Sequence, residues 1–267
     1  MIVIADLHTH TTHSYSGSST LYENLTYASK NNLTAMAVTD YGPKEHFSKK
    51  ELFEYLSKLP SSARGINILK GIEANVTDLY AAKIDIDENE VSHFDWIIGS
   101  YHQISEYDNN IVNSVFMTSL FEKLANNPII NTIGHMERYE CGFDIPKIIS
   151  LMKKRGKVIE IGAASFSSEN DTFQKKQLIS IINTCKELSA PICIVSNAHY
   201  CDEVGQFDKV LTYLDSINFP ENLVINSNLK LLRSYINNFK QMRDVELQKQ
   251  KINYGATLRA YQPNKKR

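Results

Sequence analysis

Two histidines separated by one residue stand near the start of the chain, in the run Asp6-Leu7-His8-Thr9-His10. The apolar residues before them, 2–5, are typical of a buried strand. Because residues i and i+2 of a strand point to the same side, His8 and His10 are predicted to leave the strand end on one face, where they can chelate a metal ion. Two solvated histidines are the alternative. The endings of the later strands decide between these readings.

Five of the eight histidines follow predicted strands: His8, His10, His102, His135 and His199. His46 and His93 fall in predicted loops and are read as ordinary surface or structural residues. Glu73 also stands at a strand end. Imidazoles with one carboxylate suit zinc, and also manganese or iron, better than magnesium or calcium. Glu73 can bridge two such ions, and two metal ions together can activate a water molecule for attack on phosphorus. A salt-bridged barrel carboxylate is the alternative for Glu73.

The elements that must position these residues alternate along the chain. Strands are predicted over 2–7, 34–40, 67–73, 95–101, 130–134, 157–163 and 192–197. Helices are predicted near 21–31, 48–58, 111–126, 145–155, 174–187 and 205–217, and a hairpin over 77–90. Repeated strand–helix units predict an α/β fold whose parallel sheet closes into a barrel. The carboxyl ends of barrel strands meet at one mouth, so the histidines are expected to converge there, with Asp6 and Asp40 behind them.

Composition favours one large domain. The chain has 267 residues, 42% of them hydrophobic, and a net charge of −1, which gives no strong attraction to nucleic acid or to a membrane. The four cysteines form no CxxC pair, which is typical of a reducing compartment. No apolar stretch reaches membrane-spanning length, and the apolar start reads as a strand and not as a signal peptide, so a cytoplasmic protein is expected. The composition is compatible with a monomer and with a homo-oligomer.

The end of the chain differs from the rest. Residues 228–239 read as an amphipathic helix, and residues 240–267 hold eight Lys or Arg against two acids. We therefore predict a barrel domain over 1–239 and a basic C-terminal tail over 240–267. Such a tail can touch a phosphate-rich partner, or it can be a solvated end.

The combined motifs resemble the PHP domain (polymerase and histidinol phosphatase), in particular the stand-alone bacterial PHP phosphatases. The resemblance covers about residues 1–235. It is carried by the first His-x-His run and by Thr39-Asp40-Tyr41-Gly42-Pro43, Gly71-Ile72-Glu73-Ala74-Asn75, Gly134-His135 and Ser196-Asn197-Ala198-His199. It implies a distorted seven-stranded βα barrel of the kind that usually holds three divalent metals at the strand ends and hydrolyses phosphomonoesters.

The resemblance also implies a ligand set. By position, His8, His10, Glu73 and residue 197 hold the first metal. Glu73, His102 and His135 hold the second, and His199 contributes to a third. The sequence departs from the family pattern at three places: Asn197 replaces an aspartate, Tyr41 replaces a histidine, and the first-loop ligand falls on Tyr15 or Ser16. His13 is a substitute for that loop ligand if the loop shifts.

These residues predict a metal-dependent phosphatase with a di- or trinuclear site and a small phosphorylated substrate. Arg138 is expected to clamp the phosphate, with a plain surface arginine as the alternative. Tyr41 is expected as a phenolic metal ligand or as a hydrogen-bond donor to the phosphate, and His199 as the acid for the leaving group. The substitutions leave open a degenerate PHP domain with a structural or partner-binding role. An amidohydrolase-type barrel is weaker, since Glu73 and Asn197 stand where that class needs lysine and aspartate.

Overall fold

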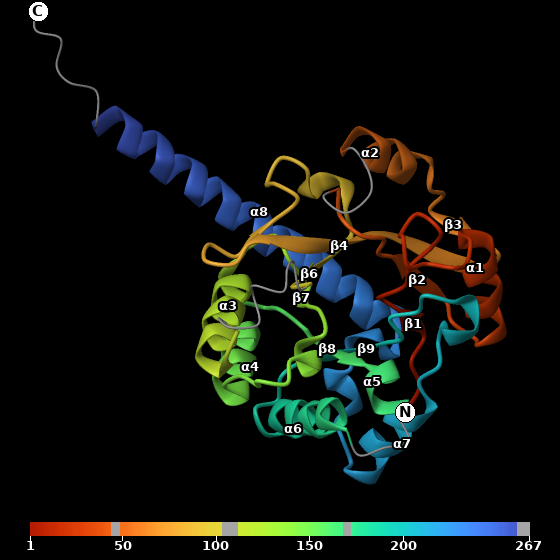
Figure 1. Cartoon of the computed structure of the whole chain (residues 1–267). Coiled ribbons are helices and arrows are strands. Elements are labelled where there is room, and N and C mark those ends of the chain that lie inside the picture. The colour runs from red at the N-terminus through yellow and green to blue at the C-terminus, as the bar shows by residue number, and fades with distance from the viewer. Residues whose placement is uncertain (44–48, 103–111, 168–171, 261–267) are drawn as a thin grey trace, which may run out of the picture.

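The protein is described by a computed structural model over residues 1–43, 49–102, 112–167 and 172–260. Parallel strands form the centre of the molecule (Figure 1): β1 (Ala5–Asp6), β2 (Ala35–Val38), β4 (Ile66–Asp78), β6 (Trp96–Ser100), β7 (Thr132–Ile133), β8 (Ile159–Gly162) and β9 (Ile192–Val195). The first five lie side by side in the order β1-β2-β4-β6-β7, and β8 pairs with β9. This curled parallel sheet confirms the predicted distorted seven-stranded barrel.

Helices follow most strands, close to the predicted positions: α1 (Leu21–Lys30), α2 (Lys49–Lys58), α3 (Ser114–Asn126), α4 (Ile145–Lys154), α6 (Phe173–Glu187) and α7 (Asp208–Ser216). Several begin where a side-chain oxygen accepts a bond from a free N–H of the first turn, as Thr20, Asn113, Asp144 and Thr172 do. A short helix, α5 (Ala163–Ser167), follows β8 directly and was not predicted. The predicted starts at 48 and 111 lie outside the described residues.

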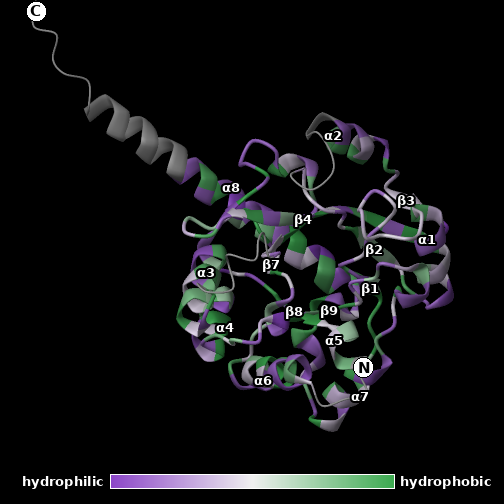
Figure 2. Ribbon diagram, viewed as in Figure 1, coloured by the Kyte–Doolittle hydropathy of each residue, from purple (hydrophilic) through white to green (hydrophobic). Residues whose placement is uncertain are grey.

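The barrel is filled by small and branched side chains. Its inner cluster comprises Ala5, Leu7, Ala35, Ala37, Trp96, Ile98, Val158, Cys193 and Val195, closed by Ile225, Leu232 and Ile236. The strands that supply this cluster are the hydrophobic centre of Figure 2, and β9 stands out in it. Trp96 is fully buried, as a core residue should be. The cluster occupies the inside of the barrel, so it leaves room for polar groups only toward the carboxyl-terminal mouth.

Strand β4 is longer than predicted, with 13 residues. It pairs in parallel with β2 over its first half and with β6 over Gly71–Asn75. Its far end turns into the predicted hairpin through β5 (Lys83–Ile84), and its start pairs with an unpredicted short strand, β3 (Ser62–Ala63). Glu73 therefore lies within a continuous strand, opposite Ile98 of β6 and bridged to Tyr41 on the other side. A residue held on both sides is a rigid platform.

The first and last strands are joined by one isolated backbone bridge and by the hydrogen bonds of one side chain. Thr9 and Ala198 form an isolated parallel bridge. Asn226 is fully buried, accepts a bond from the Ile194 N–H at 3.2 Å, and donates to the carbonyls of Ala5 and Ile194, both at 2.7 Å. The strand predicted over 2–7 is correspondingly short in the structure, because this amide takes the place of a regular ladder.

The last helix, α8 (Leu229–Ala260), has 32 residues and extends beyond the rest of the molecule in Figure 1. The helix predicted over 228–239 therefore continues through the proposed boundary at 239. Lys240 pairs with Asp95 at 2.6 Å, and Arg243 and Leu247 are buried. At least the start of the predicted basic tail thus packs on the barrel instead of being solvated. Residues 261–267 lie outside the described chain.

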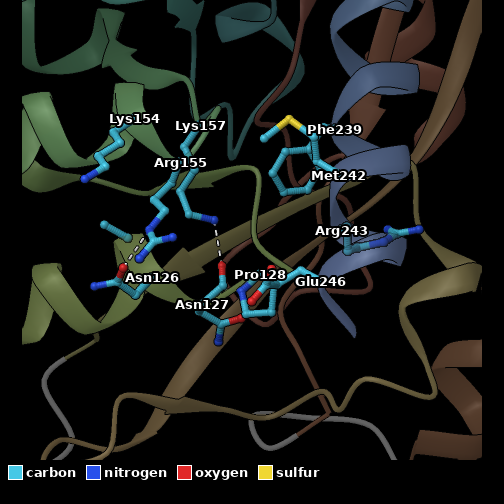
Figure 3. A pocket seen from close by; sticks show the side chains of 11 residues that line it. Asn126, Asn127, Pro128, Lys154, Arg155, Lys157, Phe239, Met242, Arg243 and Glu246 are labelled. Carbon is cyan, nitrogen blue, oxygen red and sulfur yellow. Dashed lines mark hydrogen bonds between the residues drawn. The ribbon is translucent and has the colours of Figure 1, made fainter. Parts of the chain in front are cut away.

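A pocket of about 190 Å³ lies where the carboxyl ends of α3 and α4 approach α8 (Figure 3). Lys157 is buried in it and donates to the carbonyls of Asn127 and Ile130, both at 2.6 Å, and Arg155 donates to the side chain of Asn126 at 2.8 Å. Asn127 caps the carboxyl end of α3, so Lys157 satisfies a carbonyl group at a helix end. The pocket contains none of the predicted site residues.

None of the described helices is both long enough and apolar enough to cross a membrane.

Candidate metal centre

Glu73, within strand β4, lies at the centre of four imidazoles. Its Oε2 is 3.3 Å from Nε2 of His8 and 3.2 Å from Nε2 of His10. Its Oε1 is 3.3 Å from Nε2 of His102 and 3.1 Å from Nε2 of His135. Each carboxylate oxygen therefore faces its own pair of rings. The structure brings together five of the predicted ligands in the two groups expected from the sequence.

Three of these rings are held from behind, at Nδ1. The Nδ1 of His10 is 3.1 Å from Ser14 Oγ, which donates to Asp40 at 2.7 Å. The Nδ1 of His102 is 2.5 Å from Asn75 Oδ1. When Nδ1 carries the hydrogen of such a bond, the lone pair on Nε2 is directed at Glu73. Asp40 thus orients an imidazole through Ser14, as expected for a residue behind the site.

Glu160 holds the third ring, His8, and was missed in the sequence. Both of its oxygens lie 3.2 Å from His8 Nδ1, and the carboxylate is buried. Glu160 belongs to β8, whose alternate residues Ile159 and Ile161 pack in the main core, so its side chain points to the other face. The available signal was a lone carboxylate inside the apolar run 158–162.

Unpaired buried atoms test whether a metal fits here. The Nε2 atoms of His8, His10 and His102 and Oε2 of Glu73 are buried and have no hydrogen-bond partner, although they lie close together. Unpaired buried polar atoms are costly, so their convergence calls for a further group. Ligands about 2.0–2.1 Å from a tetrahedral ion lie about 3.3 Å apart, which matches the observed separations. The residues fit divalent metal ions.

Two residues of the site have left-handed backbone conformations that are uncommon outside glycine. His135 has φ of 53° and Asn197 has φ of 56°, and each follows the end of a strand. Such conformations cost energy and concentrate at functional sites. The carboxamide oxygen of Asn197 is buried without a hydrogen-bond partner. This unpaired oxygen is available as a ligand.

Tyr41, His199 and Ser16 form a hydrogen-bonded group beside His10. The ring of His199 stacks on that of His10 at 4.4 Å, and its Nδ1 is 2.9 Å from Ser16 Oγ. Ser16 Oγ also reaches the hydroxyl of Tyr41 at 3.4 Å, and Nε2 of His199 is 3.4 Å from the amide nitrogen of Asn197. Among the described residues, the clusters able to hold a metal do not include His199.

The other predicted residues lie farther from the centre. His13 stacks on Tyr55 at 3.8 Å, so the structure does not bring it to the site as a substitute ligand. Arg138 is exposed and ends the short helix Met136–Arg138 that follows His135. Asp6 accepts bonds from the backbone N–H groups of Ser196, Gly205 and His8, so it fixes the chain and not an imidazole.

The buried charges control one another. Burial raises the pKa of Glu73, but the charge of His8 and the close approach of the other imidazoles hold it well below its usual value. Burial lowers the pKa of His8, yet Glu160 and Glu73 on either side of the ring raise it to about 10. Burial lowers the pKa of His135 to about 4. Burial and Glu73 raise the pKa of Tyr41 to about 12, so its phenol stays protonated.

Comparisons with known proteins agree with this geometry. Residues 6–164 match the PHP domain model. The chain is 30% identical over 246 residues to a probable phosphatase of Clostridium novyi (strain NT), covering 92% of this chain and 99% of the relative. It is 31% identical over 239 residues to a probable phosphatase of Caldanaerobacter subterraneus subsp. tengcongensis, covering 88% and 91%.

Among solved structures, the fold resembles histidinol phosphate phosphatase from Lactococcus lactis subsp. lactis, determined with zinc, L-histidinol and phosphate. The TM-score is 0.60 at 17% identity, and the match covers 82% of this chain and 95% of the other. At that identity, the likeness supports the fold alone. The family model covers more than half of the sequence and therefore decides the assignment. The chain belongs to the PHP domain family.

Proposed function

We propose that the protein is a metal-dependent phosphatase that hydrolyses a small phosphomonoester at a centre of two divalent ions. The observation that supports this most is the pairing of each Glu73 oxygen with its own two imidazoles, at 3.1–3.3 Å. His8, His10, Glu73 and Asn197 hold the first ion, and Glu73, His102 and His135 hold the second. The relatives described as probable phosphatases support the reaction class. Zinc suits this donor set, with manganese or iron as alternatives.

Neutral groups occupy the place where a third ion is expected. Ser16, Tyr41 and the amide of Asn197 surround His199 there. None of these three neighbours of His199 brings a carboxylate or an imidazole. Hydroxyl and amide groups without charge are weak ligands for an ion of this kind. The proposal is therefore a dinuclear centre, with His199 serving proton transfer and not a third metal.

Divalent ions held by these residues would supply positive charge that polarises a phosphoryl oxygen and lowers the pKa of a water molecule. The chain's own residues position the substrate around them. Tyr41, a protonated phenol between the rings of His10 and His102, donates a hydrogen bond to a phosphate oxygen. Arg138, exposed beside His135, neutralises charge on the phosphate. His199 and Ser16, 2.9 Å apart and half-buried, provide the path for a proton to the leaving group.

Metal content and turnover test this proposal together. Protein saturated with zinc and then desalted should retain two equivalents, and should hydrolyse p-nitrophenyl phosphate and some members of a panel of phosphorylated metabolites. Chelation should remove both metal and activity, and added zinc or manganese should restore them. Protein that retains no metal and shows no turnover after reconstitution would instead support the degenerate PHP domain with a binding role.

Replacing Asn197 with aspartate is expected to tighten binding of the first ion about tenfold or more, because it restores an anionic ligand. Aspartate also tolerates the left-handed backbone at this position. Chelator competition with zinc measures the change. Asn218→Asp is the matched control, since Asn218 also has positive φ, at 50°, and is exposed. Equal affinity in Asn197→Asp and the wild type would exclude Asn197 as a ligand.

A further inference from the structure

We propose that Glu160 is the positioning residue of the metal centre and couples its two halves from behind. The inference rests on the proposed dinuclear function. Glu73 joins the two groups of imidazoles on the side where metal binds. Glu160 joins one ring of each group on the opposite side, and the sequence motifs gave it no role.

The first half of this contact is with His8. Both Glu160 oxygens lie 3.2 Å from Nδ1, while Nε2 of the same ring lies 3.3 Å from Glu73 Oε2. The imidazole is thus held between two buried carboxylates. A histidine that binds metal through Nε2 carries its hydrogen on Nδ1, and a carboxylate there fixes the ring and makes it a stronger ligand.

The second half of the contact is with His135. Glu160 Oε1 accepts a bond from the backbone N–H of His135 at 3.4 Å and lies 3.9 Å from its Nδ1. The backbone bond helps to hold His135 in its left-handed conformation, which aims Nε2 at Glu73 Oε1. One carboxylate therefore supports a ligand of the first ion and a ligand of the second.

The other two imidazoles have neutral partners at Nδ1. His10 bonds to the hydroxyl of Ser14, and His102 bonds to the amide oxygen of Asn75. Among the residues that the structure describes, Glu160 is the carboxylate that lies at the Nδ1 atoms of the remaining two rings, those of His8 and His135. Loss of the Glu160 charge should consequently weaken the binding of both ions, and not of the first ion alone.

The test is metal affinity, measured without substrate. Glu160→Gln keeps the shape of the side chain and removes its charge. Zinc affinity of the folded variant, from chelator competition, should fall about 10–100-fold at both sites. The visible absorption of cobalt-loaded protein should change as well, because the orientation of His8 sets the ligand field. Neither readout depends on turnover, so an inactive protein whose affinity falls in this way would refute only the proposed phosphatase activity.

Glu137→Gln is the matched control. Glu137 is also a buried carboxylate near the strand ends, but it bonds to Ser165 at 2.7 Å and burial raises its pKa. Wild-type affinity in folded Glu160→Gln, or an equal loss in Glu137→Gln, would overturn the inference. If Glu160→Gln fails to fold, the proton NMR signal of the His8 Nδ1–H group in the wild-type protein tests the role of Glu160 instead. A low-field Nδ1–H resonance should be present in zinc-loaded wild type and absent from His8→Ala, and its absence from the wild type would contradict the role of Glu160.

Discussion

Replacing Glu73 with glutamine is expected to remove both metal ions and to lower turnover of a phosphate ester at least about a thousandfold. Each carboxylate oxygen faces two imidazoles at 3.1–3.3 Å, and an amide can offer an oxygen to only one of the two pairs. Its nitrogen would face the other pair, where it repels a cation. The change also removes the negative charge that the ions share.

Elemental analysis of the purified variant, together with steady-state kinetics, measures this result. Glu137→Gln again provides a buried carboxylate of the same shape that has no contact with Glu73, and it should keep its metal. Circular dichroism checks that each variant is folded. Unchanged metal content in Glu73→Gln would refute the bridging role, and loss of one ion only would show that Glu73 serves a single site.

The second large effect is expected on stability, from Asn226→Leu. Leucine has a similar size but no polar atoms, so the substitution leaves three backbone groups of β1 and β9 buried and unpaired. Each unpaired group costs about 1–3 kcal/mol, so the free energy of unfolding should fall by about 3 kcal/mol or more. Because both strands lead directly into the metal centre, the affinity for zinc should fall in parallel.

Urea denaturation monitored by tryptophan fluorescence and circular dichroism measures the loss. Asn222→Leu, at an exposed position four residues earlier, is the control and should change stability by less than about 0.5 kcal/mol. A loss below about 1 kcal/mol for Asn226→Leu would mean that the first and last strands are held together by other contacts, such as the bridge between Thr9 and Ala198.

The sequence was most informative where local pattern and position coincide. Apolar runs located the strands, and the residue after each run located Glu73 and the histidines, because parallel strands of a barrel end at one mouth. The sequence was least informative about the residues behind the imidazoles. Ser14 and Asn75 are small polar residues with no distinctive pattern, and their role exists only once the loop after β1 and the strand β4 are brought beside the rings.

The predicted lengths of some strands and helices were wrong for similar reasons. The strand before His8 shortens because Asn226, more than 200 residues away in the sequence, replaces its ladder. Helix α8 extends through the basic segment because Lys240 and Arg243 find partners on the barrel, at Asp95 and at the carbonyl of Val91. Glu160 was overlooked since its strand reads as an ordinary apolar run, in which only strand alternation reveals the inward side.

The two metal positions differ in how far apart along the chain their residues lie. Glu73, His102 and His135 come from neighbouring strands, and the ends of this group are 62 residues apart in the chain. The seam between the first and last strands joins residues 188 to 221 apart, as the contacts of Ser196 with His8 and of Asn226 with Ala5 show. Closing a longer loop costs more chain entropy. The second metal position is therefore built from the less costly loop closures, whereas the contact of Asn197 with the first position depends on closing the whole barrel.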